Sequence, residues 1–151
     1  MQIQPSPHTY NLKLIIMWIE VKVRYQAIEP NGKAAKKNET YLVQADGCQE
    51  AECIALDNLA HITDIEVKCI RVANIGNVVE GKETELGAWY KVASDIISID
   101  EKSGKCKRAR ITDLIYAKDI MRALKIGSDQ YLSSSVEIVK IEKSNIVDII
   151  K

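Results

Sequence analysis

Ile65-Glu-Val-Lys-Cys-Ile-Arg-Val-Ala-Asn-Ile75 returns 71 positions later in the chain as Val136-Glu-Ile-Val-Lys-Ile-Glu-Lys-Ser-Asn-Ile146. Four aligned positions are identical, and two more exchange valine for isoleucine or the reverse. A segment that recurs at a fixed spacing is the sequence signature of a repeated structural unit. The two segments therefore predict the same strand in two copies.

The repetition extends upstream of both segments. Trp18-Ile-Glu-Val21 matches Trp89-Tyr-Lys-Val92 at the same shift of 71, and Gly32-Lys33 matches Gly104-Lys105 at a shift of 72. The shift of 72 also relates Thr40 to Thr112, Leu42 to Leu114, Val43 to Ile115 and Ala45 to Ala117. Matches in the same order favour a true duplication over the general likeness of small α+β segments. The one extra residue of the second copy falls between Trp89 and Gly104, where Asp95 interrupts the alternation, and predicts a β-bulge.

Each copy reads as two strands, a helix and a third strand. In the first copy, residues 12–28 form a strand, since Ile19, Val21, Val23 and Tyr25 alternate with charged residues. A turn follows at Pro30-Asn31-Gly32, whose Asn and Gly accept positive φ. The second strand spans residues 37–45 and the third spans 65–72. The second copy repeats the pattern with strands at 90–100, 109–117 and 136–141.

A helix lies between the second and third strands of each copy. In the first copy we expect Asp46 to cap it, with Gln49 completing a capping box. The buried stripe of this helix is expected to comprise Ala51, Ala55, Leu56 and Leu59. In the second copy the helix is expected near residues 119–126.

These elements predict an α+β fold of two tandem ββαβ repeats with two helices and mainly antiparallel sheets. A hairpin followed by a helix places the third strand beside the first, so the strand order second–first–third is expected. We predict an N-terminal extension at 1–16, repeat 1 at 17–75, a mobile linker loop at 76–88 and repeat 2 at 89–151. One copy alone is marginal in water, so we expect the two to share a single compact globular unit.

Composition narrows the class of protein. The 21 basic and 21 acidic residues balance, so no overall field favours nucleic acid or a membrane. No apolar run approaches the roughly 20 residues needed to cross a bilayer. Cys48, Cys53, Cys69 and Cys106 form no C-x-x-C pair, and we expect free, mostly buried thiols in a reducing cytosol.

Four stretches of the chain carry a resemblance: Met17-Trp-Ile-Glu-Val-Lys-Val-Arg-Tyr25, Arg71-Val-Ala-Asn74, Trp89-Tyr-Lys-Val92 and Asp100-Glu-Lys-Ser-Gly-Lys105. Together they resemble an uncharacterised family of small proteins from Bacteroides-type gut bacteria and their phages. Members of that family begin at the Met-Trp pair, so residues 1–16 depart from its pattern. The resemblance implies a cytoplasmic location in a bacterial host cell and a phage or mobile-element context. It brings no activity and no functional residue.

Catalysis and metal binding find little support in the residues. Of the two histidines, His8 lies in the N-terminal extension, and His61 at a helix end is better explained by the helix dipole than as a general base. A pair of His61 with Cys69 has nothing beside it to orient it. The close pairs of Cys or His that structural zinc requires are missing from the sequence. We therefore expect a non-enzyme without metal or cofactor.

Basic and aromatic residues are the remaining candidates for binding. Lys33, Lys36 and Lys37 near the first hairpin tip are mirrored by Lys105, Lys107, Arg108 and Arg110 in the second. They either bind phosphate groups or protect strand edges from aggregation. The tryptophans either anchor the core or lie with arginines in a groove between the copies. The predicted ligand-binding residues are Trp18, Arg24, Tyr25, Arg71, Trp89, Lys105, Arg108 and Arg110.

Three functions follow from these observations. The first is a non-catalytic protein that sequesters an anionic, nucleotide-like ligand, such as a host immune signal, in counter-defence. The second is a protein–protein interaction module or inhibitor that uses an exposed strand edge. The third is weak nucleic-acid binding through the basic hairpins, which the neutral charge makes the least expected. Open sheet edges also predict a homo-oligomer.

Overall fold

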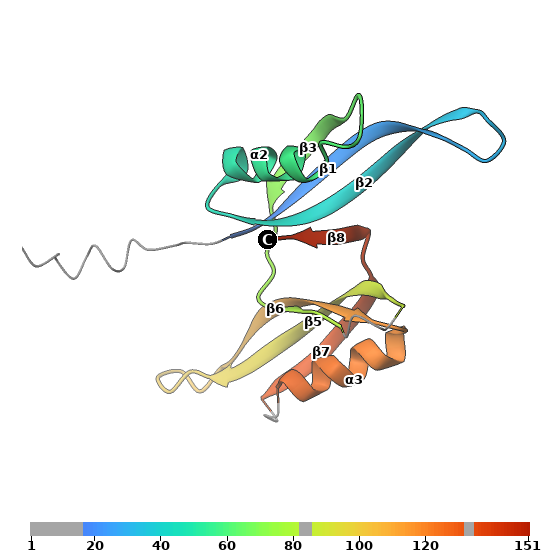
Figure 1. Ribbon diagram of the computed structural model, residues 1–151. Helices are drawn as coiled ribbons and strands as arrows, with labels where there is room; N and C mark the ends of the chain where they lie inside the picture. The colour runs from blue at the N-terminus through green and yellow to red at the C-terminus, as the bar shows by residue number, and fades with distance from the viewer. Residues whose placement is uncertain (1–16, 82–85, 132–134) are drawn as a thin grey trace, which may run out of the picture. The chain divides into compact units, whose positions relative to one another are not determined.

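The computed structural model describes residues 17–81, 86–131 and 135–151 and has the predicted α+β architecture. Within these ranges, two helices accompany two four-stranded sheets (Figure 1). The predicted extension at 1–16, with His8, lies outside the described residues.

The first sheet has the strand order predicted for a ββαβ repeat. Strand β1 (Met17–Ile28) pairs antiparallel with β2 (Ala34–Ala45) on one side and with β3 (Glu66–Val72) on the other. Helix α2 (Cys48–Asn58) connects β2 to β3. A fourth strand, β8 (Ile146–Ile150), lies beside β2, so the full order is β3-β1-β2-β8.

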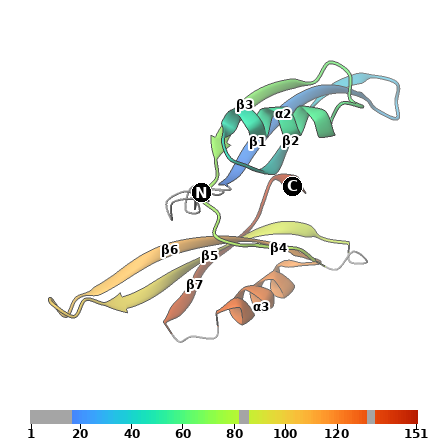
Figure 2. The same cartoon turned by 60° about the vertical axis from the view of Figure 1, so that its left-hand side comes forward.

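The second sheet repeats the arrangement. Strand β5 (Ala88–Ile99) lies between β6 (Cys106–Ala117) and β7 (Val136–Lys143), antiparallel to both. Helix α3 (Ile120–Gln130) connects β6 to β7 (Figure 2). The two-residue strand β4 (Val78–Val79) pairs parallel with β6, so part of the predicted linker loop forms a strand.

The duplication extends to details of the backbone. The carbonyl of Trp18 accepts a hydrogen bond from the amide of Ala73 at 2.8 Å, and that of Trp89 accepts one from Ser144 at the same distance. The third strand of each repeat shifts register against the first at equivalent positions, between Lys22 and Val23 and between Ala93 and Ser94. Both repeats therefore have the same register shift between their first and third strands.

The extra residue of the second copy lies in the hairpin turn and not in a bulge. Pairing of β1 with β2 ends at Ile28 opposite Ala34, whereas pairing of β5 with β6 ends at Ile99 opposite Cys106. Five residues therefore connect the first hairpin and six connect the second. Gly32 and Gly104, with φ of 81° and 68°, supply the left-handed turn residue in both.

The prediction that Asp46 caps the first helix is wrong. Gly47 is the N-cap and forms no side-chain cap, while the amide of Asp46 donates to the carboxylate of Glu50 at 3.4 Å. In the second copy Asp119 is a true N-cap, since its side chain accepts a hydrogen bond from the amide of Arg122 at 2.8 Å.

Small residues bring each helix onto its sheet. Ala51 and Ala55 of α2 are fully buried, and the equivalent residues of α3 are Ala123 and Gly127. A Cβ added at Gly127 would lie 3.1 Å from Val92, so a larger residue at this position would crowd the sheet. Of the predicted α2 stripe, Leu59 is buried and Leu56 half-buried. The predicted alternation of β1 is confirmed by the complete burial of Ile19, Val21 and Val23.

The chain folds as two compact units, and the sheet of each unit receives its fourth strand from the chain segment that follows the other repeat. Unit 1 comprises the described residues up to Ala73 together with Asp148–Lys151, and unit 2 comprises Asn74–Val147. The segment after β3 supplies β4 to the sheet of unit 2, and the segment after β7 supplies β8 to the sheet of unit 1. Ile150 of β8 belongs to the buried core of unit 1. The predicted single globular unit stays a prediction.

Candidate functional site

The register of unit 1 gathers polar side chains at the far end of its sheet. Arg24 on β1 lies opposite Asn38 on β2, and Gln26 lies opposite Lys36. On its other side Arg24 pairs with Glu66, the first residue of β3. Residues directly opposite across neighbouring strands point to the same face of a sheet, so these side chains share one face.

A cavity of about 310 Å³ opens at this place. It is lined by Arg24, Tyr25, Gln26, Lys36, Asp64 and Glu66. Asp64 adopts the left-handed conformation, with φ of 56°, in the turn that leads into β3. Aspartate tolerates this region better than most residues, and the turn brings a second carboxylate to the cavity beside Glu66.

Arg24 keeps hydrogen-bonding capacity for a ligand. Its Nε donates to Oδ1 of Asn38 at 3.1 Å, which is a neutral acceptor. Among the described residues no carboxylate forms an ion pair with Arg24 or with Lys36. A guanidinium has five N–H donors in a planar fork, so several donors of Arg24 stay available to an anionic group.

A tyrosine–glutamate cluster fixes Tyr25 at the edge of the cavity. The hydroxyl of Tyr25 donates to Oε1 of Glu39 at 2.6 Å, and the hydroxyl of Tyr41 donates to the other carboxylate oxygen. The hydrogen bond to Glu39 raises the pKa of Tyr25, with desolvation adding to it. The pKa of Tyr41 is also raised, mainly by burial and secondly by its hydrogen bond to Glu39. Both phenols therefore stay neutral donors at physiological pH.

The equivalent place in unit 2 is closed by ion pairs. Asp95 stands where unit 1 has Arg24, and Nε of Arg110 lies 2.6 Å from its Oδ1. Arg108 lies 3.6 Å from the same carboxylate and 3.2 Å from Glu137. The hydrogen bond from Arg110 holds the pKa of Asp95 below its usual value. Arg108 and Arg110, both predicted ligand-binding residues, are thus engaged by acidic partners within their own unit.

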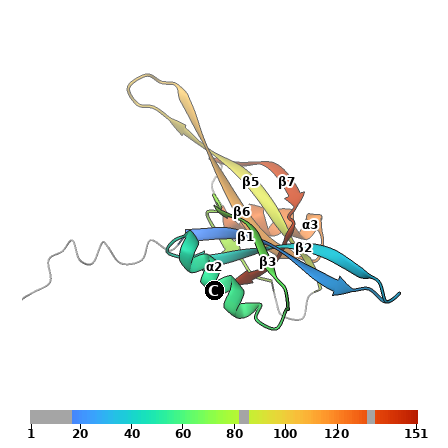
Figure 3. The ribbon, with the colours of Figure 1, turned by 90° about the horizontal axis from the view of Figure 1, so that it is seen from above.

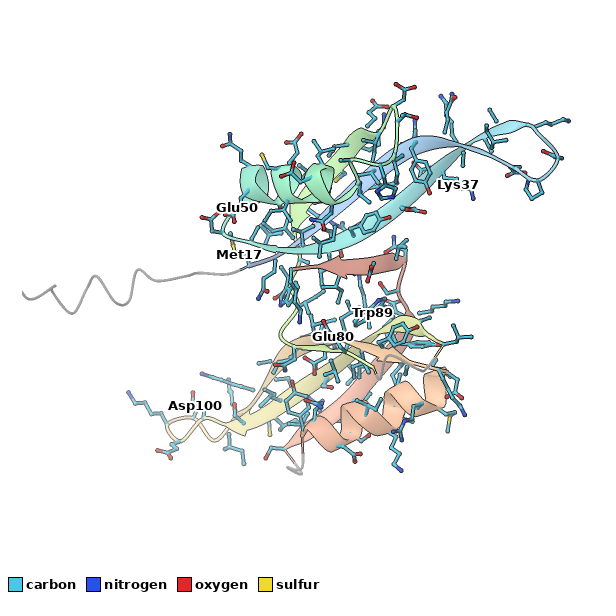
Figure 4. The ribbon with its side chains drawn as sticks, viewed as in Figure 1. Met17, Lys37, Glu50, Glu80, Trp89 and Asp100 are labelled. Carbon is cyan, nitrogen blue, oxygen red and sulfur yellow. The ribbon has the colours of Figure 1, made fainter. Side chains whose placement is uncertain are left out.

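The other predicted residues are also dispersed. Arg71 donates to Glu20 at 2.7 Å, across β3 and β1. Trp89 is buried and packs edge-on against Tyr116, with ring centroids 5.2 Å apart, whereas Trp18 is half-buried. Lys105 is exposed next to the turn of the second hairpin, whose Asp100 is labelled in Figure 4. Only Arg24 and Tyr25 of the predicted set line the cavity, and the groove predicted between the copies stays a prediction.

Of the six lining residues, sequence reasoning missed Gln26, Asp64 and Glu66, and it named Lys36 only as a basic hairpin residue that either binds phosphate or protects a strand edge. The hairpin turn at Gly32 offered a way to find two of them, because the turn sets the register that places Lys36 opposite Gln26. No sequence pattern pointed to Asp64, since its conformation comes from the turn that joins α2 to β3.

The expectation of mostly buried thiols is wrong. Cys48, Cys53, Cys69 and Cys106 are all free and exposed. In the described part of the chain, no three Cys, His, Asp or Glu side chains come together in a way that could hold a metal ion. Across the same residues, no helix has the length and apolar character needed to cross a membrane.

The outer strands β3 and β7 carry many charges. The charged side chains are Glu66, Lys68 and Arg71 on β3, and Glu137, Lys140, Glu142 and Lys143 on β7. Charged residues on an edge strand oppose the addition of a further strand. The strands at the opposite edges, β8 and β4, carry a single charged residue between them, Asp148, so the strand-edge interaction module stays a prediction.

Comparison with known proteins adds a family. A family model described as a domain of unknown function (DUF4494) matches residues 17–151, which leaves out only the first 16 residues. No curated protein and no solved structure matches the chain.

Proposed function

The chain belongs to the family described as a domain of unknown function (DUF4494), and from this premise we propose that it is a non-catalytic binding protein for a small anionic, nucleotide-like ligand. The ligand occupies the cavity of unit 1. Its anionic group meets Arg24 and Lys36, and its hydrogen-bond donors meet the carboxylates of Asp64 and Glu66. A nucleotide offers both, through its phosphate and through its ribose hydroxyls and base amino groups.

The observation that supports this proposal is that the side-chain hydrogen-bond partner of Arg24 carries no negative charge. Its partner Asn38 is neutral, whereas Arg71 and Arg110 lie 2.7 and 2.6 Å from carboxylates. An arginine that already holds a carboxylate must give it up before it binds a phosphate, and Arg24 has no such competition. The cavity volume of about 310 Å³ lies at the lower end of the range of small-molecule sites.

The biological setting is part of the same proposal. We place the protein in the cytoplasm of a bacterial host, encoded by a phage or mobile element of Bacteroides-type bacteria. There it counters host defence by sequestering a nucleotide immune signal and does not transform it. The proposed homo-oligomer adds avidity, and light scattering that gives a monomer mass at high micromolar concentration would refute self-association.

Thermal unfolding against a panel of mono-, di- and cyclic nucleotides tests the proposal. A ligand at a hundred times its dissociation constant stabilises the folded state by about 2.7 kcal/mol. We expect at least one nucleotide to raise the unfolding midpoint and Arg24→Gln to weaken that ligand about 10- to 100-fold, the loss expected for a charge-assisted hydrogen bond. Arg24→Lys keeps the positive charge but lacks the planar guanidinium, so its affinity for the nucleotide should lie between those of the unmodified protein and Arg24→Gln.

Lys125→Gln on the exposed surface of α3 is the matched control, because it removes one positive charge away from the cavity. It should bind like the unmodified protein. If no nucleotide shifts the midpoint, or if Arg24→Gln and Lys125→Gln bind equally well, the cavity is not a nucleotide site.

A further inference from the structure

The two hairpins continue past the third strand of their sheets (Figure 3). In unit 1, β3 pairs with β1 only as far as Arg24, while β1 and β2 stay paired to Ile28 opposite Ala34. In unit 2, β7 pairs with β5 to Ile96, while β5 and β6 stay paired to Ile99. We name the two-stranded ends arm 1, residues 25–37, and arm 2, residues 97–108. A two-stranded ribbon gains little stability by itself in water, so a fold has no structural need for such extensions.

Each arm presents an isoleucine to solvent at its tip. Ile28 is 81% exposed and Ile99 is 68% exposed. They occupy equivalent positions of the duplication, 71 residues apart, and each is followed by a turn with a left-handed glycine and then a lysine. The copies have diverged at the cavity, where Arg24 corresponds to Asp95. Retention of an exposed isoleucine in both arms therefore indicates a use for it.

The arms are basic within a chain of zero net charge. Arm 1 has three lysines and one glutamate, and arm 2 has three lysines and one arginine against one aspartate and one glutamate, so each has a formal net charge of +2. In arm 2 the charge of Arg108 is engaged by Asp95 and Glu137, which lie outside the arm. Five of these lysines form no ion pair within the described part of the chain: Lys33, Lys36, Lys37, Lys102 and Lys105. Figure 4 shows Lys37 projecting from arm 1.

We propose that the arms bind duplex DNA. A two-stranded β-ribbon can lie in the minor groove of B-form DNA, the groove from which architectural proteins insert apolar wedges between base steps. The lysines along the ribbon contact phosphates on either side of the groove. The isoleucine at the tip contacts a base step as an apolar wedge, the role that exposed Ile, Leu, Met or Pro residues play in DNA-bending proteins. The sequence alone disfavoured nucleic acid on overall charge, but an arm binds through its local charge.

Fluorescence anisotropy with the full chain and a labelled duplex of about 30 base pairs tests the proposal. With four or five phosphate contacts, the affinity should fall about 150- to 500-fold between about 50 and 200 mM salt. Lys33→Gln combined with Lys105→Gln should weaken binding and reduce the slope of log affinity against log salt by about 2, since each lost contact contributes about 1. Neither lysine lines the cavity, so nucleotide binding should not change.

Ile28→Ser combined with Ile99→Ser separates the wedge from the charges. This variant should keep the salt slope, lose about tenfold in affinity, and reduce the bend reported by energy transfer between the duplex ends. Met121→Ser is the matched control, because Met121 is 69% exposed on α3 and lies outside both arms. Unchanged thermal unfolding would show that the variants are folded.

Three results would overturn the proposal. The first is no binding of the duplex at about 50 mM salt. The second is equal binding by the arm variants and the controls. The third is tighter binding of poly-glutamate than of the duplex with no effect of the isoleucine substitutions, which would assign the arms to an acidic protein partner.

Discussion

The same cross-strand position has opposite chemistry in the two units. In unit 1 Arg24 faces the neutral Asn38, and in unit 2 Asp95 faces Arg110. Lys36 corresponds to Arg108 and Glu66 to Glu137, so both sites have two further ionisable residues at matching places. In unit 2 the basic and acidic groups satisfy one another, and in unit 1 the basic groups face a cavity. One backbone thus supports a closed ion-pair cluster or an open site, depending on the two side chains of one cross-strand pair.

The units also differ in how much their fourth strand contributes. Strand β8 has five residues and places Ile150 in the core of unit 1, whereas β4 has two half-buried residues. Unit 1 therefore depends on the last residues of the chain. The predictions below test both differences, beginning with the largest expected effect.

Ile150→Ala should destabilise unit 1 by about 2–5 kcal/mol, the range for truncating a buried isoleucine. Val79→Ala, at the equivalent position of β4, should cost less because Val79 is only half-buried. Hydrogen exchange resolved by segment checks this, since β1 and β2 should lose protection in Ile150→Ala while β5 and β6 retain it. Equal loss in both units would show that the strand exchange couples them fully.

Asn38→Asp should convert the open site of unit 1 into the closed kind. The new carboxylate faces Arg24, as Asp95 faces Arg110, and competes with an anionic ligand. We expect nucleotide affinity to fall at least about tenfold, while a surface ion pair adds at most about 1 kcal/mol to stability. Asn38→Ser, which removes the amide without adding charge, should bind nearly as well as the unmodified protein. Isothermal titration measures both.

Asp95→Asn should open the cluster of unit 2 and change its response to acid. The pKa of Asp95 is lower in the folded state than in the unfolded chain, where it is about 3.9. The ion pairs of Asp95 therefore stabilise the fold fully above about pH 3.9, and this stabilisation is lost as the pH falls through the folded-state pKa. The unmodified protein should therefore lose stability below about pH 3.9 more steeply than the variant. Denaturation midpoints at pH 7 and at about pH 3 provide the comparison, and parallel curves would contradict it.

Glu39→Gln should change the ionisation of the tyrosines without a large effect on folding. The hydrogen bond to Glu39 raises the pKa of Tyr25 and contributes to that of Tyr41. Their neutral forms stabilise the fold below the unfolded pKa of about 10, and this contribution is lost as pH rises through the folded pKa. Absorbance titration at alkaline pH should show both tyrosines ionising late in the unmodified protein and earlier in the variant. Asp148→Asn on β8, a minor influence on Tyr41, is the control and should leave Tyr25 unchanged.

Much of the fold could be predicted from the sequence repetition. The features that could not be predicted depend on information that local sequence patterns do not contain. The strands and both helices follow from patterns within about a dozen residues, and the strand order follows from the order of the elements in each repeat. Strand β4 did not, because two residues carry no periodicity and their partners Leu114 and Ile115 lie far along the chain. The extra residue was misplaced because a change in alignment shift cannot separate an insertion in a strand from one in the turn that follows. Buried thiols were expected because cysteine is usually buried, a preference that says nothing of a particular strand face.

The sequence by itself determined the duplication, the alternating strands and the basic hairpins, because each of them is visible as a pattern of residue types along the chain. Only the tertiary structure established that β8 completes unit 1, that Arg24 faces a cavity, and that Arg108 and Arg110 form ion pairs with Asp95 and Glu137. The physical reason is distance. Whether a charge is available to a ligand depends on which atoms lie within about 3–4 Å, and strand register brings those atoms together from far along the chain.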